Sequence, residues 1–376
     1  MTRILYMLSP FKCGGGEIFI DSLLNEFKSS KKIKIDVLCY TDSVMFTNLL
    51  MKAGYNPILL NKGLRVQANG KIKIFLLSLL FFFQSILNLK LLNAYDILHV
   101  HSVPLAFVVG MLTKLRLIRK KVIKVYTHHA TKKDGNGVLY LKIYSYLLSS
   151  FDKLIGVSTS SSESLRSNFP DLIKKIETIS NGVDLKKLKN LSNRELVREK
   201  YNINKENVIG IYVARYIPTK NHKFLIDVVK KVRSKNFKII IVGEGDLKKN
   251  FINETKTNGL YERFILFDFI ENKELYSLLS ASDFCIFPSV SEGLSVVLLE
   301  NSAMKLPIVC FKNVCPAEVK VALRSSSEEE FIKNVEYVLD VENRQKIVSE
   351  MSKYVESYGI SNTAQHYIQM YNKLIS

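Results

Sequence analysis

The chain has 376 residues, of which 47% are hydrophobic and 24% are charged. That length predicts two domains with cores of their own, and the composition excludes an intrinsically disordered protein. The 54 lysines and arginines outnumber the 35 acidic residues and give a formal charge of +19, so the surface should attract phosphorylated ligands, other polyanions or anionic membrane faces. No RNA-binding signature accompanies this charge, which argues against a nucleic-acid partner.

Cysteine usage and the N-terminus both indicate the cytoplasm. The five cysteines include no CxxC pair and predict reduced, mostly buried thiols: Cys13, Cys39, Cys285, Cys310 and Cys315. The opening MTRILYMLSP lacks a charged stretch followed by a long apolar one, so no signal peptide is expected.

Short runs rich in Ile and Val alternate with segments of helical period along the whole chain, which is the pattern of parallel sheets built from βαβ units. In the first half, the expected strands are RILYML, KIDVLCY, NPILL, DILHVH, KVIKVYTH and KLIGVS. In the second half they are VIGIYVARY, KIIIVGEG, FILFDF, FCIFPS and PIVCF, with helices between them, for example over 223–235 and 272–282. The fold class is therefore α/β.

One segment of the first half resembles a membrane helix. Residues 74–92 read IFLLSLLFFFQSILNLKLL, but Gln84, Asn88 and Lys90 interrupt the apolar run. A spanning helix needs about 20 mostly apolar residues, so we favour an amphipathic helix that covers a sheet. A helix lying in the membrane interface, flanked by the basic Lys71 and Lys73, is the alternative.

A junction between the halves is predicted at ISNGVDLKKLKNLSNRE, residues 179–195, where a turn-forming Asn181-Gly182 precedes a stretch of little apolar periodicity. We therefore expect domains over residues 1–180 and 181–356. Two Rossmann-like halves facing each other create a cleft at the carboxyl ends of both sheets, where open α/β sheets bind ligands. The chemistry should therefore lie in loops that follow strands.

Three glycines follow the first strand in SPFKCGGGE: Gly14, Gly15 and Gly16. They allow a sharp turn and the close approach of a ligand to the backbone, and the helix that follows points its N–H groups at that ligand, which suits a phosphate. The spacing is not GxGxxG, so a nicotinamide dinucleotide is disfavoured. A flexible loop without a chemical role remains the alternative.

Histidines end two of the expected strands. His99 and His101 share one face of their strand, but no nearby carboxylate or cysteine cluster completes a zinc-type site with them. We expect His99 to be a core residue. Of the pair His128 and His129, we select His129 to donate a hydrogen bond into the cleft, because it lies nearer the loop.

Two basic residues follow the first strand of the second half, in VARYIPTKNH. A lone Arg or Lys is usually a solvated surface charge, but Arg215 and Lys220 together at one strand end suit a phosphate group. The guanidinium would bind it through two hydrogen bonds and the ammonium as a point charge.

The segment SEGLSVVLLEN, residues 291–301, places two glutamates on either side of an expected helix start. Ser295 is a natural N-cap, so the N–H groups of Gly293, Leu294 and Ser295 should form an anion site. Glu292 on the loop and Glu300 in the helix would then flank the anion and accept hydrogen bonds from sugar and ribose hydroxyls.

Together these motifs resemble a known family. The Glu292-x7-Glu300 pattern in PSVSEGLSVVLLENSAMKLPIV, with SNGVD, VARYIPTKNH, IIVGEGD and GGGE, is similar to the family 4 retaining glycosyltransferases of the GT-B fold. KNHKFLIDVV and CPAEVKV further resemble the branch that builds bacterial capsular and exopolysaccharide units. One departure is Asn301, which stands where similar enzymes often have alanine.

The resemblance implies a GT-B architecture and roles for the residues named above. Arg215 and Lys220 would bind the diphosphate of a nucleotide sugar, Glu300 its ribose, and Glu292 the transferred sugar, with Gly14 to Gly16 beside the donor and His129 as the cleft histidine. The segment 357–376 would return to the first domain as a helix.

The expected activity is that of a retaining, metal-independent hexosyltransferase. By resemblance, it would use a nucleotide diphosphate donor, a UDP-sugar, and a glycan or polyprenyl-diphosphate-linked acceptor at the anionic inner membrane face. No Asp-x-Asp occurs in the sequence, so neither a metal nor another cofactor is expected. The alternatives are a nucleotide-sugar epimerase on the same fold and a non-catalytic membrane partner of a polysaccharide assembly complex.

Overall fold

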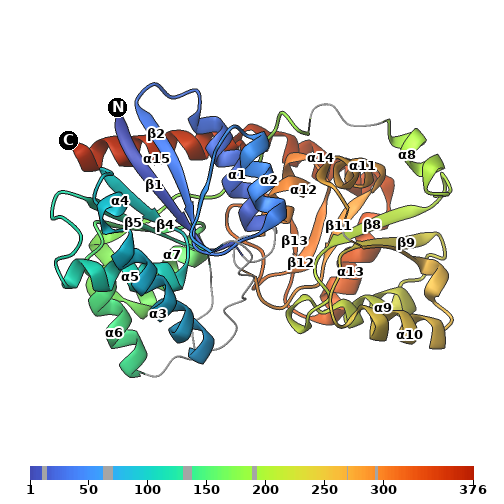
Figure 1. The fold of residues 1–376 in the computed structure, drawn as a ribbon. Coiled ribbons are helices and arrows are strands. Elements are labelled where there is room, and N and C mark those ends of the chain that lie inside the picture. The colour runs from blue at the N-terminus through green and yellow to red at the C-terminus, as the bar shows by residue number, and fades with distance from the viewer. Residues whose placement is uncertain (11–14, 62–70, 130–137, 189–192, 269, 293–294) are drawn as a thin grey trace. The chain divides into compact units, whose positions relative to one another are not determined.

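The computed structural model describes residues 1–10, 15–61, 71–129, 138–188, 193–268, 270–292 and 295–376 (Figure 1). The chain divides into two compact units. Unit 1 comprises Met1–Gly182 and Ile360–Ser376, and unit 2 comprises Val183–Gly359. Where the chain enters and leaves unit 2, Val183 and Gly359 form a parallel bridge, and the Val183 N–H donates to the Tyr358 carbonyl at 2.7 Å.

Unit 1 is built on a parallel sheet that has seven strands in the described part of the chain, in the order β3-β2-β1-β4-β5-β6-β7. The strands are β1 (Thr2–Leu8), β2 (Ile33–Cys39), β3 (Ile58–Leu59), β4 (Ile97–Val100), β5 (Ile123–His128), β6 (Lys153–Gly156) and β7 (Ile176–Thr178). The chain runs outward from β1 to β3 and then crosses to β4, so the order reverses between β1 and β4. At such a point the loops on either side diverge and leave room for a ligand.

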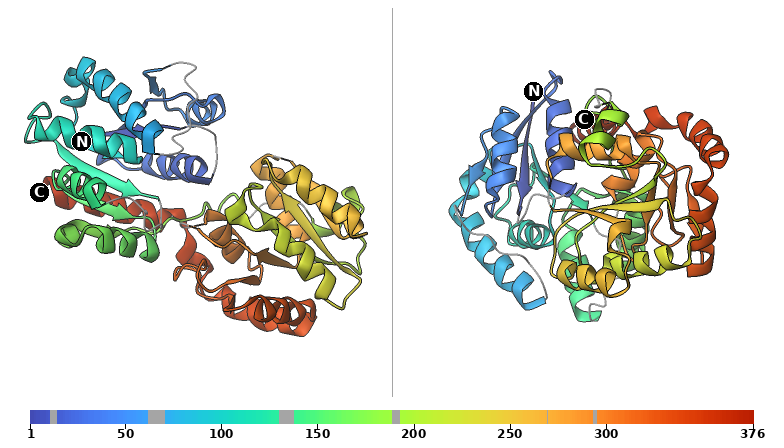
Figure 2. Two further views of the ribbon diagram at one scale, coloured as in Figure 1. Left: turned by 90° about the horizontal axis from the view of Figure 1, so that it is seen from below. Right: turned by 90° about the vertical axis from the view of Figure 1, so that its right-hand side faces the viewer.

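Helices cover both faces of this sheet. They are α1 (Gly15–Phe27), α2 (Val44–Lys52), α3 (Lys71–Leu87), α4 (Leu89–Leu92), α5 (Val103–Lys114), α6 (Val138–Leu148), α7 (Thr159–Asn168) and α15 (Ile360–Ile375). One hydrophobic core joins α3, α5 and α6 to alternate residues of the strands, such as Leu5, Leu98 and Tyr126. On the other face, α15 packs against α1, and Figure 2 shows it lying among the elements of unit 1.

Unit 2 holds a second parallel sheet, with six strands among the described residues, in the order β10-β9-β8-β11-β12-β13. The strands are β8 (Val208–Val213), β9 (Phe237–Val242), β10 (Phe264–Phe267), β11 (Phe284–Phe287), β12 (Ile308–Phe311) and β13 (Leu323–Ser325). Its helices are α8 (Arg194–Lys200), α9 (His222–Lys231), α10 (Lys248–Thr257), α11 (Asn272–Ala281), α12 (Val296–Ala303), α13 (Glu328–Leu339) and α14 (Val341–Ser352). The strand order reverses between β8 and β11, the two strands whose loops carry VARYIPTKNH and SEGLSVV.

The structure confirms the predicted α/β class with parallel sheets, and each of the eleven predicted strands is present. Two further strands, β7 and β13, have only three residues each and escaped prediction. The segment 74–92 forms two helices, because α3 ends at Leu87 and α4 begins at Leu89. Among the described residues, no helix combines the length and the apolar character that crossing a bilayer requires.

Candidate functional site

Two loops of unit 2 are tied together at the point where the strand order reverses. The hydroxyl of Tyr212, a buried residue of β8, donates to the Lys220 carbonyl at 2.7 Å and lies 2.8 Å from the hydroxyl of Ser289. The backbone N–H of Val290 donates to the Thr219 carbonyl at 2.9 Å. The loop after β8 and the loop after β11 therefore have fixed positions relative to each other.

This arrangement brings two predicted site residues into direct contact. The ammonium of Lys220 forms an ion pair and a hydrogen bond with the carboxylate of Glu292. The two side chains keep only 19% and 9% of their surface exposed, so both charges are largely removed from water. Charges this far removed from water need pairing, and the ion pair stabilises both side chains.

Arg215, the other predicted basic residue, is exposed and forms no ion pair with the described part of the chain. Glycines hold its loop in place. A Cβ on Gly243, where φ is +157°, would lie 2.0 Å from the Ala214 carbonyl oxygen. A Cβ on Gly245, where φ is +147°, would lie 2.6 Å from that of Tyr216. The GEG sequence therefore lets the loop after β9 press against the backbone on both sides of Arg215.

The loop after β8 also contains a residue in the left-handed conformation and a pair of stacked rings. Asn221 has φ 51° and ψ 41° and caps the start of α9. The ring of His222 stacks on that of Tyr216, with centroids 3.9 Å apart and an interplanar angle of 18°. Asn is among the few residues that adopt this conformation readily, which explains its place directly after Lys220.

The helix start predicted after Glu292 is present, and Ser295 occupies the N-cap position of α12. Its carbonyl accepts from the Leu298 N–H at 3.1 Å, whereas its hydroxyl makes no capping hydrogen bond. Gly293 and Leu294, which were predicted to share this anion site, lie outside the described residues.

Glu300 lies deeper in α12 and away from the surface. It is 7% exposed, and its carboxylate accepts a hydrogen bond from the hydroxyl of Tyr276 at 3.1 Å. Burial raises the pKa of Glu300 to about 7, and the hydrogen bond only partly opposes this shift. Next to it, the buried Asn301 donates from its amide to the Val297 carbonyl at 2.6 Å, which helps an asparagine fit at this position.

Sequence reasoning missed two polar residues of this half. Tyr276 lies in the predicted helix 272–282, but only the packing of α11 on α12 reveals that it reaches Glu300. Lys248, at the start of α10, donates to the Phe267 carbonyl at 2.9 Å and to the Asp268 carboxylate at 2.6 Å. Its ammonium thereby ties the loops after β9 and β10 together.

In unit 1, the core role expected for His99 is confirmed. The residue is fully buried, and its two ring nitrogens lie 2.6 Å from the Tyr371 hydroxyl and 2.7 Å from the Thr127 hydroxyl. Tyr371 also bonds the Tyr6 hydroxyl at 2.7 Å. The C-terminal helix is therefore fastened to the sheet of unit 1 through hydrogen bonds inside the core.

His129 follows β5 and contacts a second histidine that was not selected from the sequence. Its Nε2 lies 3.3 Å from Nδ1 of His101, so one ring N–H donates to the lone pair of the other ring. The His101 ring stacks on Tyr6, with centroids 4.8 Å apart. Burial, and to a smaller extent the neighbouring His128, lower the pKa of His129 to about 4, so the imidazole is neutral at physiological pH.

The glycine loop of unit 1 is described only in part. Gly15 is the first residue of α1, both Gly15 and Gly16 are exposed, and Gly14 lies outside the described residues. No described atom lies within 4 Å of the place that a Cβ on Gly16 would take. The start of α1 therefore leaves open space in which a ligand could approach the backbone.

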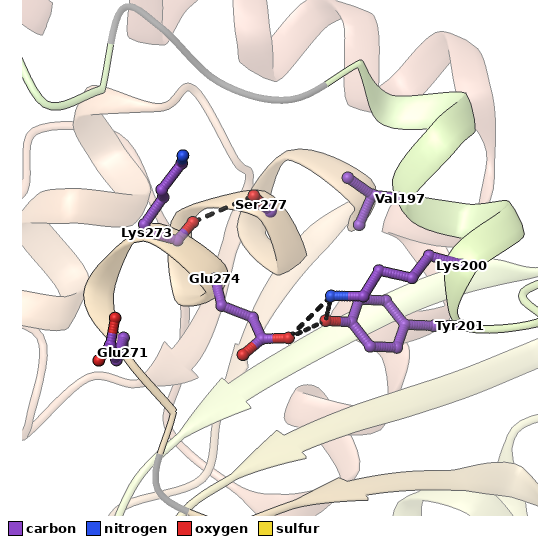
Figure 3. Close-up of a pocket in the computed structure, with 7 residues that line it drawn as sticks. All are labelled: Val197, Lys200, Tyr201, Glu271, Lys273, Glu274 and Ser277. Atoms are coloured by element: carbon purple, nitrogen blue, oxygen red, sulfur yellow. Dashed lines mark hydrogen bonds and ion pairs between the residues drawn. The ribbon is translucent and has the colours of Figure 1, made fainter.

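The pocket drawn in Figure 3 lies elsewhere in unit 2, between α8 and α11. It has a volume of about 320 Å³ and is lined by Val197, Lys200, Tyr201, Glu271, Lys273, Glu274 and Ser277. Glu274 accepts hydrogen bonds from both Lys200 and Tyr201, so these side chains satisfy one another. None of the predicted site residues lines this pocket.

Within the described residues, no group of three or more His, Cys, Asp or Glu side chains could hold a metal ion.

Two family models match this chain, one in each half. Residues 13–187 match the model described as Glycosyltransferase Family 4, and residues 193–358 match the model described as Glycosyl transferases group 1. The second match contains Arg215, Lys220, Glu292 and Glu300.

Individual relatives are more distant. The O-antigen biosynthesis glycosyltransferase WclY of Escherichia coli is 25% identical over 320 residues, which are 82% of this chain and 79% of WclY. A diphospho-undecaprenol 4-alpha-N-acetylgalactosaminyltransferase of Campylobacter jejuni is 28% identical over 180 residues, 48% of this chain and 46% of that enzyme. The chain thus spans only about half the length of some curated relatives it matches.

The fold also matches solved structures. The crystal structure of Anabaena HepE in complex with UDP superposes with a TM-score of 0.79 and 16% sequence identity, covering 99% of this chain and all of HepE. Identity this low makes the likeness evidence for the fold alone. The structural likeness confirms the predicted GT-B architecture.

The close approach of Gly243 to Ala214 yields a prediction about stability. Gly243→Ala should lower the free energy of unfolding by about 2–3 kcal/mol, since a Cβ there meets a backbone carbonyl and the backbone angle favours glycine. Gly259→Ala is the matched control, because Gly259 also has a positive φ, +64°, but open space around it. It should lose only about 1 kcal/mol. Equal losses in urea titrations of the two variants would contradict this role of Gly243.

Proposed function

We propose that this chain, whose two halves match the models Glycosyltransferase Family 4 and Glycosyl transferases group 1, transfers a sugar from a nucleotide diphosphate donor in the synthesis of a bacterial surface polysaccharide. The Escherichia coli relative acts in O-antigen biosynthesis, which supports this setting. The donor is proposed to be a UDP-sugar, in line with the UDP bound by HepE. The acceptor is proposed to be a glycan or a polyprenyl-diphosphate-linked oligosaccharide, as the name of the Campylobacter jejuni enzyme suggests.

The observation that carries this proposal is the meeting of Lys220 and Glu292 where the strand order of unit 2 reverses. A diphosphate needs positive charge, and a sugar needs acceptors for its hydroxyl groups. Lys220 and the exposed Arg215 would supply the first, and Glu292 would supply the second. A bound nucleotide sugar would therefore replace the ion pair with two separate interactions. The diphosphate would bind Lys220, and the sugar hydroxyls would donate to Glu292.

The proposed chemistry retains the configuration of the sugar. The bond between the anomeric carbon and the diphosphate breaks, and the acceptor hydroxyl attacks from the same face while its proton passes to the leaving phosphate oxygen. Arg215, Lys220 and the N-terminal end of α12 would stabilise the charge that develops on this oxygen. The transfer is proposed to need no metal, because these groups would already neutralise the diphosphate.

Glu300, His129 and the glycine loop would orient the donor. Glu300 would accept hydrogen bonds from the ribose, and the glycine loop of Gly14, Gly15 and Gly16 would lie beside the phosphates. His129, which is neutral because of its low pKa, would hydrogen-bond the transferred sugar without adding a charge.

The enzyme is proposed to work in the cytoplasm, in peripheral contact with the inner face of the membrane, where a lipid-linked acceptor would be found.

The first test concerns Lys220. Purified protein would be assayed for sugar transfer from a panel of UDP-sugars, and Lys220→Ala should reduce kcat by about 10²-fold or more because one charge-assisted contact to the leaving diphosphate is lost. Lys223→Ala is the control, since Lys223 lies in the same region but its side chain is 74% exposed and pairs with Glu254. Unchanged turnover of a folded Lys220→Ala variant would refute the assignment.

The metal-free mechanism is tested separately. Transfer by the wild-type protein should continue at the same rate in excess EDTA, because side chains and backbone N–H groups are proposed to hold the diphosphate. Activity that disappears with EDTA and returns with Mg²⁺ or Mn²⁺ would overturn this part of the proposal while leaving the transfer itself intact.

Glu300 predicts a pH dependence of donor binding. Its folded pKa of about 7 lies above the ordinary pKa of a glutamate, 4.5, so the carboxyl gains its charge only as the pH rises through about 7. The ionised form is the stronger acceptor for ribose hydroxyls, so affinity for a UDP-sugar should rise between about pH 6 and 8. Calorimetric titration should show this rise for the wild type and a flat profile for Glu300→Gln. The same rise in both proteins would exclude Glu300 as its source.

A further inference from the structure

The helix α3 exposes a stripe of large apolar side chains. Phe83 leaves 62% and Leu87 leaves 85% of its surface exposed. The stripe, which we call the α3 face, consists of Phe75, Leu76, Leu79, Leu80, Phe83 and Leu87. These positions recur at spacings of three to four residues, so they lie on one side of the helix.

The opposite side of α3 is already in use. Leu77, Phe81 and Ser85 are buried, and the two apolar residues belong to the core that α3 shares with α5 and the sheet. The packing of unit 1 therefore accounts for one side of the helix only. A soluble surface rarely keeps an apolar patch of this extent unless the patch binds something.

A second helix of the same layer repeats the pattern. Leu139, Ile143 and Tyr146 of α6 are exposed at spacings of four and three residues, so they also share one side of their helix. The helix α5 contacts both α3 and α6, and all three belong to one core on one face of the sheet (Figure 1).

The charge around these helices indicates what covers them. Residues 71–152 contain twelve lysines and arginines but only three acidic residues, Asp96, Asp134 and Asp152, which is a net charge of +9 out of +19 for the whole chain. Exposed examples are Lys90, Arg116, Lys120 and Lys121. A second copy of the chain would bring a like charge against this region, whereas an anionic lipid surface would bring the opposite charge.

We propose that the α3 face, together with the exposed side of α6, inserts into the interfacial region of an anionic lipid bilayer. An apolar side rich in Phe and Leu with basic residues around it is the pattern of helices that lie in the plane of the interface. Such a position agrees with the finding that no helix in the described residues could cross a bilayer. The proposal deepens the membrane contact in the proposed function, but docking itself requires no sugar transfer.

The test is flotation of the full chain with vesicles of phosphatidylglycerol and phosphatidylethanolamine, in the absence of any sugar. The wild type should float with these vesicles, bind vesicles of phosphatidylcholine less, and dissociate as salt screens the charge. The double variant Phe83→Asp with Leu87→Asp should lower the vesicle partition coefficient at least about tenfold, because two apolar anchors are lost.

The matched control is the double variant Leu196→Asp with Val341→Asp. Both residues are exposed apolar positions of unit 2, at 62% and 54%, and the substitutions change the net charge by the same amount. Its vesicle binding should equal that of the wild type. Equal binding by both double variants, or no flotation of the wild type, would overturn the proposal.

Two further measurements distinguish lipid binding from dimerisation through the α3 face and from the proposed sugar transfer. Loss of a lipid-free dimer in the Phe83→Asp and Leu87→Asp variant, seen by sedimentation, would show instead that a second copy covers the α3 face. Transfer to a water-soluble acceptor should be the same in this variant as in the wild type. A wild type that binds vesicles but transfers no sugar would refute the proposed function and leave the lipid surface standing.

Discussion

The ion pair between Lys220 and Glu292 is the interaction on which the candidate site of unit 2 depends. Two charges that are mostly withdrawn from water stabilise each other, so removal of one deprives the other of its charged partner. On the proposed function, a donor must therefore offer an anion to Lys220 and hydroxyl groups to Glu292 at the same time. A free phosphate satisfies only the lysine, so the pair itself favours a ligand in which diphosphate and sugar are joined.

The strands were predictable because their signal is local. Runs of Ile and Val stand out in the sequence, and β8 and β9 coincide with such runs. The three-residue strands β7 and β13 are too short to show periodicity, and pairing at an edge of the sheet defines them instead. The break between α3 and α4 was also not predicted, although Asn88, whose amide donates to the Gln84 carbonyl, stands at it.

The contacts within the site were less predictable, because they depend on strand order. Lys220 and Glu292 are 72 positions apart and meet because β11 pairs with β8, although β9 and β10 come between them in the chain. The sequence assigned each of the two a ligand and did not reveal that they bind each other. The hydrogen bond from Tyr276 to Glu300 and the contact between His101 and His129 arise in the same way from packing between elements distant in sequence.

The apolar segment at 74–92 shows how one sequence pattern can carry two meanings. The sequence offered two interpretations for the whole helix, a helix covering a sheet and a helix touching lipid, and our proposal assigns them to its two sides. In the structure, Phe81 lies in the core while Phe83, two residues later, is largely exposed. A helix that is apolar on every side loses the contrast by which periodicity separates core from surface. In the structure, α3 packs against α5, and Leu77 and Phe81 share a core with α5 and the strands of the sheet.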